Sequence, residues 1–288
     1  TGSETSTCSE ADCGKTFTRE IPALGHAWDI RNVIKPATPE EDGTVTYTCT
    51  RCGEKRTETL KIVSSGTCGA EGDGSNLTWM LDNEGTLTIS GTGDMARFGN
   101  QLWRDQKVKK AVIANGVTSI GEYAFSDCTY LESVTIPNSV TSIGNWAFNG
   151  CSSLTNVTIP DGVTRIADDA FRGCTSLASV TIPSNVKDIY SGAFLGCDAL
   201  KEVNYLDSKE AFHTISIGEY SKAILQAATI HYFAQWDMEK QPTCTEAGHG
   251  TSQCSEDGCT KTYSREFPAL GHAWDIRNVI KPATPEED

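Results

Sequence analysis

Three pairs of closely spaced cysteines near the ends of the chain are the residues best suited to metal or redox chemistry. They are Cys8 and Cys13, Cys49 and Cys52, and Cys254 and Cys259. The segment Cys49-Thr-Arg-Cys52-Gly has the spacing of a zinc knuckle, in which a tight turn directs two thiolates at one ion. The first two pairs, Cys8, Cys13, Cys49 and Cys52, therefore form a candidate four-sulfur zinc site.

Other arrangements of these cysteines remain open. A histidine could complete a site, with His26 joining the first pair or His272 joining Cys244, Cys254 and Cys259. Alternatively the pairs form disulfides, as is common in small modules of an oxidising compartment, or stay reduced, while the histidines only mark a Leu-Gly-His turn. No complete set of four ligands lies within one module. We therefore expect no cofactor, with zinc in the flanking modules as the alternative.

A second set of cysteines recurs every 23 residues in the middle of the chain, at Cys128, Cys151, Cys174 and Cys197. Equivalent positions on stacked strands lie about 4.8 Å apart with parallel Cα–Cβ bonds. A disulfide instead needs Cβ atoms about 3.8 Å apart and a fixed torsion. We therefore expect these four cysteines to be buried and reduced, and the single Cys68 to be buried as well.

Catalytic chemistry finds little support in the sequence. No histidine occurs between Asp94 and Lys201, and Asp168-Asp169 is the only pair of adjacent carboxylates in the repeated part of the chain. Adjacent acids on a turn rarely converge on one substrate atom, and His213 and His231 are expected to have packing roles. Neither a Gly-x-Ser-x-Gly motif nor a phosphate-binding glycine loop is present. The prediction is a protein that is not an enzyme, with no catalytic residues.

A repeat of 23 residues positions the cysteines and carboxylates in the middle of the chain. The phrases VTSIGEYAFSDCTYLESVTIP, VTSIGNWAFNGCSSLTNVTIP and VTRIADDAFRGCTSLASVTIP begin at Val117, Val140 and Val163, and a degenerate fourth copy begins at Val186. Aligned copies place apolar residues in columns, such as the isoleucines, phenylalanines and leucines at Ile120, Ile143, Ile166, Ile189, Phe125, Phe148, Phe171, Phe194, Leu131, Leu154, Leu177 and Leu200. A fixed period of this length predicts a solenoid, in which each unit buries its apolar residues against its neighbours.

Local sequence predicts the course of each repeat. The Val-Thr-Ile segment alternates apolar and polar residues, which predicts a short strand that ends at Pro137, Pro160 or Pro183. The segment that starts at Ile120 is expected to turn the chain back through a short strand and a helical turn. Residues 108–114 have the same pattern and extend the stack by one coil.

These motifs resemble the BspA-like leucine-rich repeat, through the pattern LxxVTIPxxVTxIGxxAFxxC over roughly residues 64–232. The resemblance implies an α/β-type, right-handed leucine-rich repeat solenoid of short parallel strands joined by turns or short helical turns. It also implies a secreted or cell-surface binding protein, similar to an adhesin, that contacts host or surface proteins. The alternatives are an accessory or spacer region of a larger secreted bacterial enzyme and a structural stalk.

The ends of the chain carry a second repeat. Residues 24–42 recur identically as residues 270–288, and the flanks resemble the CxxCG and IPALGHxW modules of secreted bacterial proteins. The expected organisation is two small cysteine-bearing β modules (1–63), an N-terminal cap (64–107), the leucine-rich repeats (108–205), a C-terminal cap (206–235) and the start of a truncated further module (236–288). We expect the chain to be a fragment of a longer protein, with its signal and anchor outside the fragment.

Composition is consistent with an extracellular or cell-surface location. The formal net charge of −14 argues against nucleic acid or an anionic membrane as the main partner. No apolar run approaches the length of a membrane helix, so we expect no membrane insertion. Neither the ligand nor the oligomeric state follows from the sequence.

Candidate binding residues come from the positions expected to face solvent. Tyr123 and Trp146 share a column that holds Asp169 in the next repeat, so this column is expected to be exposed, with Tyr130 nearby. Aromatic residues carry much of the energy of protein interfaces. The outward strand positions Thr135, Thr158 and Thr181 are the second candidate surface.

Overall fold

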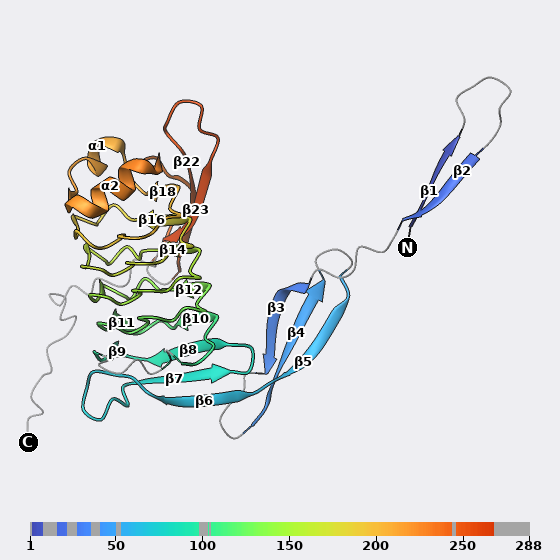
Figure 1. Ribbon diagram of the computed structural model, residues 1–288, viewed down its shortest axis with the longest axis horizontal. Helices are drawn as coiled ribbons and strands as arrows, with labels where there is room; N and C mark the ends of the chain where they lie inside the picture. Colours follow the sequence, from blue (N-terminus) through green and yellow to red (C-terminus); the bar gives the residue numbers. More distant parts are fainter. Residues whose placement is uncertain are drawn as a thin grey trace, which may run out of the picture. The chain divides into compact units, whose positions relative to one another are not determined.

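The chain forms two compact units in a computed structural model that describes residues 2–7, 16–21, 28–35, 41–49, 53–97, 103, 105–243 and 246–267 (Figure 1). The first unit comprises Thr1–Ser64 with Asp82–Glu84, and the second comprises Ser65–Leu81 with Gly85–Asp288. No helix among the described residues has both the length and the apolar character needed to cross a bilayer.

Antiparallel strands make up the first unit. Strands β1 (Gly2–Thr7) and β2 (Thr16–Ile21) form a hairpin. Strands β3 (Trp28–Lys35), β4 (Gly43–Cys49) and β5 (Lys55–Leu60) form a sheet with β4 in the centre. The Thr-Val-Thr-Tyr-Thr segment of β4 alternates polar and apolar residues, and its Val45 is fully buried. The pattern is that of a strand with one covered face.

A hairpin lies at the start of the second unit. Strands β7 (Leu77–Asp82) and β8 (Thr86–Gly91) pair antiparallel. Strand β6 (Ile62–Thr67) lies next to β7 and forms the edge of the same sheet. The turn ends at Gly85, whose φ of +87° favours glycine and where a Cβ would lie 2.7 Å from the Lys107 carbonyl oxygen. The hairpin therefore turns at residues 82–85.

Parallel strands stacked on this hairpin form a β-solenoid of about six turns with a period of ~23 residues (Figure 1). One side of the stack carries β10 (Lys110–Ile113), β12 (Ser133–Thr135), β14 (Asn156–Thr158), β16 (Ser179–Ile182) and β18 (Glu202–Tyr205). A second row carries β9 (Gly93–Asp94), β11 (Val117–Ile120), β13 (Ser142–Ile143), β15 (Arg165–Ile166) and β17 (Asp188–Ile189). Each repeat thus contributes one strand to each row.

The apolar columns predicted from the repeat form one continuous core. The Ile, Phe and Leu columns are buried in all four copies, with Phe125, Phe148, Phe171 and Phe194 fully so. Strand pairing aligns Val157 with Val180 and Val180 with Val203, so equivalent side chains stack directly. The inward assignments are confirmed, although Val134 and Ile136 in the first repeat are only partly buried.

The segments that connect the two strands of each repeat are turns rather than helical turns, which is one of the two expected forms. Residues 121–127 form successive turns, with Tyr123 and Asp127 in the left-handed region at φ of 60° and 57°. A left-handed residue interrupts the right-handed dihedrals that an α-helix needs. Backbone amides in these turns bond the next repeat instead, for example Phe125 N–H to the Ala147 carbonyl at 2.7 Å. The turns therefore form a third ladder along the stack.

Helices occur at the end of the solenoid. Helix α1 (Lys209–Phe212) begins after Ser208, whose side chain accepts a hydrogen bond from the Ala211 amide. Helix α2 (Glu219–Ala227) buries Leu225 against the core. The remaining strands are β19 (Ser216–Ile217) and β20 (Thr229–Tyr232) of the cap, and β21 (Asp237–Lys240), β22 (Gly248–Gln253) and β23 (Thr262–Phe267) of the C-terminal module. Strand β20 pairs with β18 and is the last strand of the four-stranded sheet β14-β16-β18-β20.

Candidate binding surface

Tyr123 and Trp146, which form the aromatic column, have an unusual backbone conformation. Tyr123, Trp146 and Asp169 hold the same position in three successive repeats, with φ of 60°, 54° and 53°. The Tyr123 amide donates to the Asn145 carbonyl, and the Trp146 amide to the Asp168 carbonyl, both at 3.2 Å. The inter-repeat ladder therefore includes this position. Aspartate tolerates the left-handed region, whereas bulky aromatic residues rarely adopt it.

The two aromatic rings stack on each other along the solenoid. Their centroids lie 5.1 Å apart with planes 5° from parallel. The Arg97 guanidinium lies 6.0 Å from the Tyr123 ring centroid and pairs with Glu122 at 3.0 Å. Both rings are half-buried rather than exposed as expected, because each covers part of the other. The column thus presents the edges of a stacked aromatic pair with a cation at one end.

A groove of about 420 Å³ borders this column. It runs across the second row of strands and is lined by Glu122, Thr141, Ser142, Asn145, Thr164 and Arg165, among others. Glu122 and Asn145 directly precede the two aromatic residues. The groove offers small polar side chains and one charge of each sign beside the aromatic edges. Such a surface can form hydrogen bonds and apolar contacts with one partner.

The other predicted contact residues lie apart in the fold. Tyr130 is 53% exposed in the loop before β12, on the way to the opposite row of strands. Thr135 of β12 and Thr158 of β14 are exposed on the outer side of the row of strands that runs from β10 to β18. Thr181 is only 5% exposed, so its assignment to a binding surface is wrong. Its exposed fraction differs from that of Thr158 although both hold the same repeat position.

The C-terminal module covers this end of the sheet face. Lys261 pairs with Glu202 of β18 at 2.6 Å, and Arg265 pairs with Asp161 at 2.8 Å. The Arg265 guanidinium also lies 4.6 Å from the Trp236 ring centroid within the module, so its ion pair to Asp161 is what joins the module to the solenoid. Figure 1 shows β23 beside the strands of the later repeats. The face open to a partner is therefore confined to the earlier strands.

The repeat cysteines are buried and reduced, as predicted, and so is Cys68. Three of the thiols donate to the phenylalanine carbonyl of the preceding repeat: Cys151 to Phe125 at 3.1 Å, Cys174 to Phe148 at 3.2 Å, and Cys197 to Phe171 at 3.1 Å. Burial raises the pKa of Cys68 to about 12 and raises the pKa of Cys151 well above its usual value. The role of these thiols is packing and hydrogen bonding.

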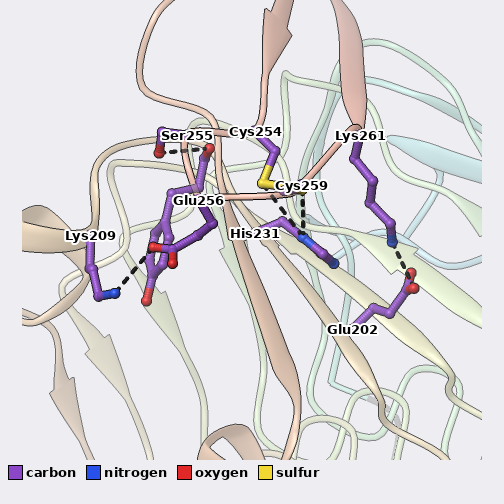
Figure 2. The surroundings of a disulfide bond; sticks show 9 residues. Glu202, Lys209, His231, Cys254, Ser255, Glu256, Cys259 and Lys261 are labelled. Atoms are coloured by element: carbon purple, nitrogen blue, oxygen red, sulfur yellow. Dashed lines mark hydrogen bonds and ion pairs between the residues drawn. A yellow bond between two sulfur atoms is a disulfide. The ribbon is translucent and has the colours of Figure 1, made fainter.

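The third cysteine pair is a disulfide, which was one of the open alternatives. Cys254 and Cys259 are bonded, with Cα atoms 5.9 Å apart. Beside them lies His231 of the C-terminal cap, which the sequence did not connect to any cysteine (Figure 2). Burial lowers the pKa of His231, and so does the nearby Lys261. A hydrogen bond from Lys261 lowers the pKa of Glu202.

The candidate four-sulfur site lies outside the residues whose side chains the structure describes. Cys8, Cys13 and Cys52 are not among the described residues, and Cys49 is described only as the last backbone position of β4. His26, Cys244 and His272 are likewise not described. Zinc, disulfide and reduced thiol therefore all stay predictions for the first two pairs.

The adjacent carboxylates in the array have structural contacts. Asp168 accepts a hydrogen bond from the Gly192 amide at 3.1 Å, and Asp169 pairs with Arg172 at 3.6 Å. Asp168 therefore contacts the next repeat, whereas Asp169 contacts a residue of its own turn.

Comparisons with known proteins define the central region. Residues 96–220 match the BspA type leucine-rich repeat region in six copies. No curated protein matches the chain significantly.

Several solved structures resemble part of the chain. A leucine-rich repeat protein from Eubacterium ventriosum is 24% identical, with a TM-score of 0.40 over 51% of this chain and 45% of the other. A leucine-rich cell surface protein from Faecalibacterium prausnitzii is 33% identical, with a TM-score of 0.34 over 49% and 41%. The pneumococcal vaccine antigen PcpA is 20% identical, with a TM-score of 0.39 over 55% and 48%.

The alignments thus span less than half the length of each of these three proteins. The 23-residue period, the stacked core and the family match agree for the central part of the chain. Residues 96–220 form a BspA-type leucine-rich repeat region.

Proposed function

We propose that this chain is part of a secreted or cell-surface binding protein, similar to an adhesin, that contacts other proteins through its solenoid. The contact surface is the Tyr123–Trp146 column with Arg97 and the adjoining groove. Leucine-rich repeat solenoids present long regular surfaces that suit protein recognition. The cell-surface location is drawn from the family and from the printed description of the F. prausnitzii protein.

The single observation that supports this surface is a pair of bulky aromatic residues in the left-handed region. Strained backbone conformations persist where the fold enforces them and cluster at functional sites. The fold enforces the conformation at Asp169 too, where a well-tolerated residue fills the position. Tyrosine and tryptophan are thus costly choices at this position for stability alone, which favours a role in recognition.

The experiment uses a substitution that suits the left-handed backbone. Trp146→Asn removes the indole but keeps a residue type that tolerates positive φ. Loss of the stacked pair costs about 0.5–1.5 kcal/mol, and relief of the strain returns about 1–2 kcal/mol. The variant should therefore fold with a stability within about 1 kcal/mol of wild type. Its matched control is Tyr220→Asn, which removes a 60% exposed aromatic side chain from α2.

Binding to immobilised matrix proteins and to host cells is then measured for both variants. A hot-spot residue contributes at least about 2 kcal/mol, so Trp146→Asn should weaken binding about 30-fold. Tyr220→Asn should bind as wild type does. If both variants keep full binding with intact folding, the contact surface lies elsewhere, on the open strand face or in the flanking modules.

A structural role as a stalk or spacer is the second candidate. The observation that favours it is the set of ion pairs that join the C-terminal module to the solenoid, Lys261–Glu202, Arg265–Asp161 and Lys209–Glu256. Such contacts restrict motion between successive modules. A wild-type protein that binds none of the matrix proteins or cells would favour this role.

A further inference from the structure

Three potential metal ligands from distant parts of the chain meet beside the C-terminal cap. They are Nδ1 of His231 on β20 and the Sγ atoms of Cys254 and Cys259, which all lie within 4.8 Å of one another. Nδ1 lies 3.7 Å from the Cys254 sulfur and 3.3 Å from the Cys259 sulfur. Figure 2 shows the imidazole turned toward the turn that carries both cysteines. The cap and the module thus supply one cluster jointly.

The position of His231 makes this arrangement unusual. Strand pairing aligns His231 with Asn204, so it occupies the outward column that holds Thr158 and Thr181 in earlier repeats. A histidine on the outer face of a solenoid is ordinarily exposed to solvent, yet the His231 residue is only 8% exposed. The module buries it, and both cysteine sulfurs face its Nδ1 atom. The charged groups beside it are Glu202 and Lys261, which pair with each other.

Two thiolates and one imidazole are a ligand set that zinc favours over calcium or magnesium. With Zn–S bonds of about 2.3 Å and Zn–N bonds of about 2.0 Å, tetrahedral ligands lie about 3.5 Å apart for each sulfur–nitrogen pair. The two observed sulfur–nitrogen distances, 3.7 and 3.3 Å, lie on either side of this value. The histidine is therefore already placed for a metal, and only the two sulfurs must separate.

We propose that reduced Cys254 and Cys259, together with Nδ1 of His231, bind one Zn²⁺ ion that clamps the C-terminal module to the cap. A water molecule takes the fourth position. The disulfide is the oxidised state of the same site. Two thiolates balance the charge of the ion, so the buried cluster is neutral. This site is independent of the proposed binding surface, which lies in other repeats.

The conversion between the two states is a defined redox step. A dithiol reductant supplies two electrons and two protons, which break the S–S bond and give two thiols. The reductant becomes a disulfide. Zinc binding then releases the two thiol protons to solvent, because the thiolate is the ligand. A disulfide reagent that accepts the two electrons, with two protons from solvent, becomes two thiols, re-forms the Cys254–Cys259 bond and expels the ion, since a disulfide has no thiolate to offer.

The test uses the full chain, reduced with a dithiol, desalted under nitrogen and mixed with zinc alone. Native mass spectrometry counts bound ions, and peptide mapping measures how far zinc slows alkylation of Cys254 and Cys259. His231→Gln keeps a polar side chain but removes the imidazole ligand. The matched control is His213→Gln, because His213 is an exposed histidine of the same cap.

We expect the reduced wild type and reduced His213→Gln each to bind one more ion than reduced His231→Gln at the same zinc concentration. In both, zinc should slow alkylation of the two cysteines at least tenfold. His231→Gln should lose this ion or bind it more than tenfold more weakly. Other cysteines of the chain contribute equally to every variant, so the difference isolates this site. Equal metal content and equal protection of Cys254 in wild type and His231→Gln would overturn the proposal, provided that circular dichroism shows both folded.

Discussion

Replacing Phe148 with alanine tests the stacked core at its most enclosed point. Phe148 is fully buried, with the Phe125 ring centroid 5.0 Å away on one side and that of Phe171 5.3 Å away on the other. Both neighbouring ring planes lie within 2° of parallel with it. Phe194 is equally buried, but its only ring partner in this column is Phe171, at 5.7 Å.

The expected loss in the free energy of unfolding depends on the burial of the phenylalanine and on the number of rings stacked on it. Truncation of a buried phenylalanine to alanine costs about 3–5 kcal/mol, because apolar surface is lost and a cavity is left. Each stacked aromatic pair contributes about 0.5–1.5 kcal/mol beyond burial. Phe148→Ala removes two such pairs and Phe194→Ala removes one. The first variant should therefore be the more destabilised by about 0.5–1.5 kcal/mol.

Guanidinium denaturation followed by far-ultraviolet circular dichroism gives the free energies of unfolding. Thr158→Ala serves as the control, since this exposed strand position should cost less than about 1 kcal/mol. Equal losses for Phe148→Ala and Thr158→Ala would refute the inward and outward assignments. A larger loss for Phe194→Ala than for Phe148→Ala would refute the contribution of the stack.

Three further perturbations test separate contacts. Because burial raises the pKa of Cys151, native protein at about pH 8 should react with an aromatic disulfide reagent far more slowly than unfolded protein. The hydrogen bond from Thr118 lowers the pKa of Asp94 below its ordinary 3.8, so its stabilisation is present above that value and is lost as the pH falls through the folded-state pKa. Asp94→Asn should thus destabilise the protein at neutral pH by less than about 1 kcal/mol, and denaturation should show no difference from wild type in strong acid. Arg265→Ala removes the ion pair to Asp161, so chymotrypsin should cleave the C-terminal module faster while the melting of the solenoid is unchanged.

The core of this fold can be predicted from the sequence because each repeat buries the same apolar positions against its neighbours. Four copies place Phe125, Phe148, Phe171 and Phe194 in one column, and a column that stays apolar in every copy must face inward. The geometry of stacked strands likewise predicts reduced cysteines at Cys151 and its equivalents. These predictions depend only on contacts between neighbouring repeats.

Contacts outside the period could not be predicted in the same way. Thr181 has the same repeat position as Thr158, yet Thr181 is buried and Thr158 is exposed, so the period alone does not predict the difference. The approach of His231 to Cys254 depends on how the C-terminal module packs against the cap. The positive φ at Trp146 could not be predicted, because tryptophan rarely adopts the left-handed region. Asp169 and the glycine-rich neighbourhood of the turn were the available signals.

Hydroxyl-radical footprinting tests the proposed recognition surface most directly. The wild-type chain is oxidised alone and with whichever matrix protein or cell surface it binds, and mass spectrometry follows each aromatic side chain. If Tyr123 and Trp146 form the contact surface, the partner should slow oxidation of both side chains while the exposed Tyr220 reacts at an unchanged rate. Unchanged oxidation of Tyr123 and Trp146, with protection confined to Trp236 and Tyr263 of the C-terminal module, would contradict this assignment.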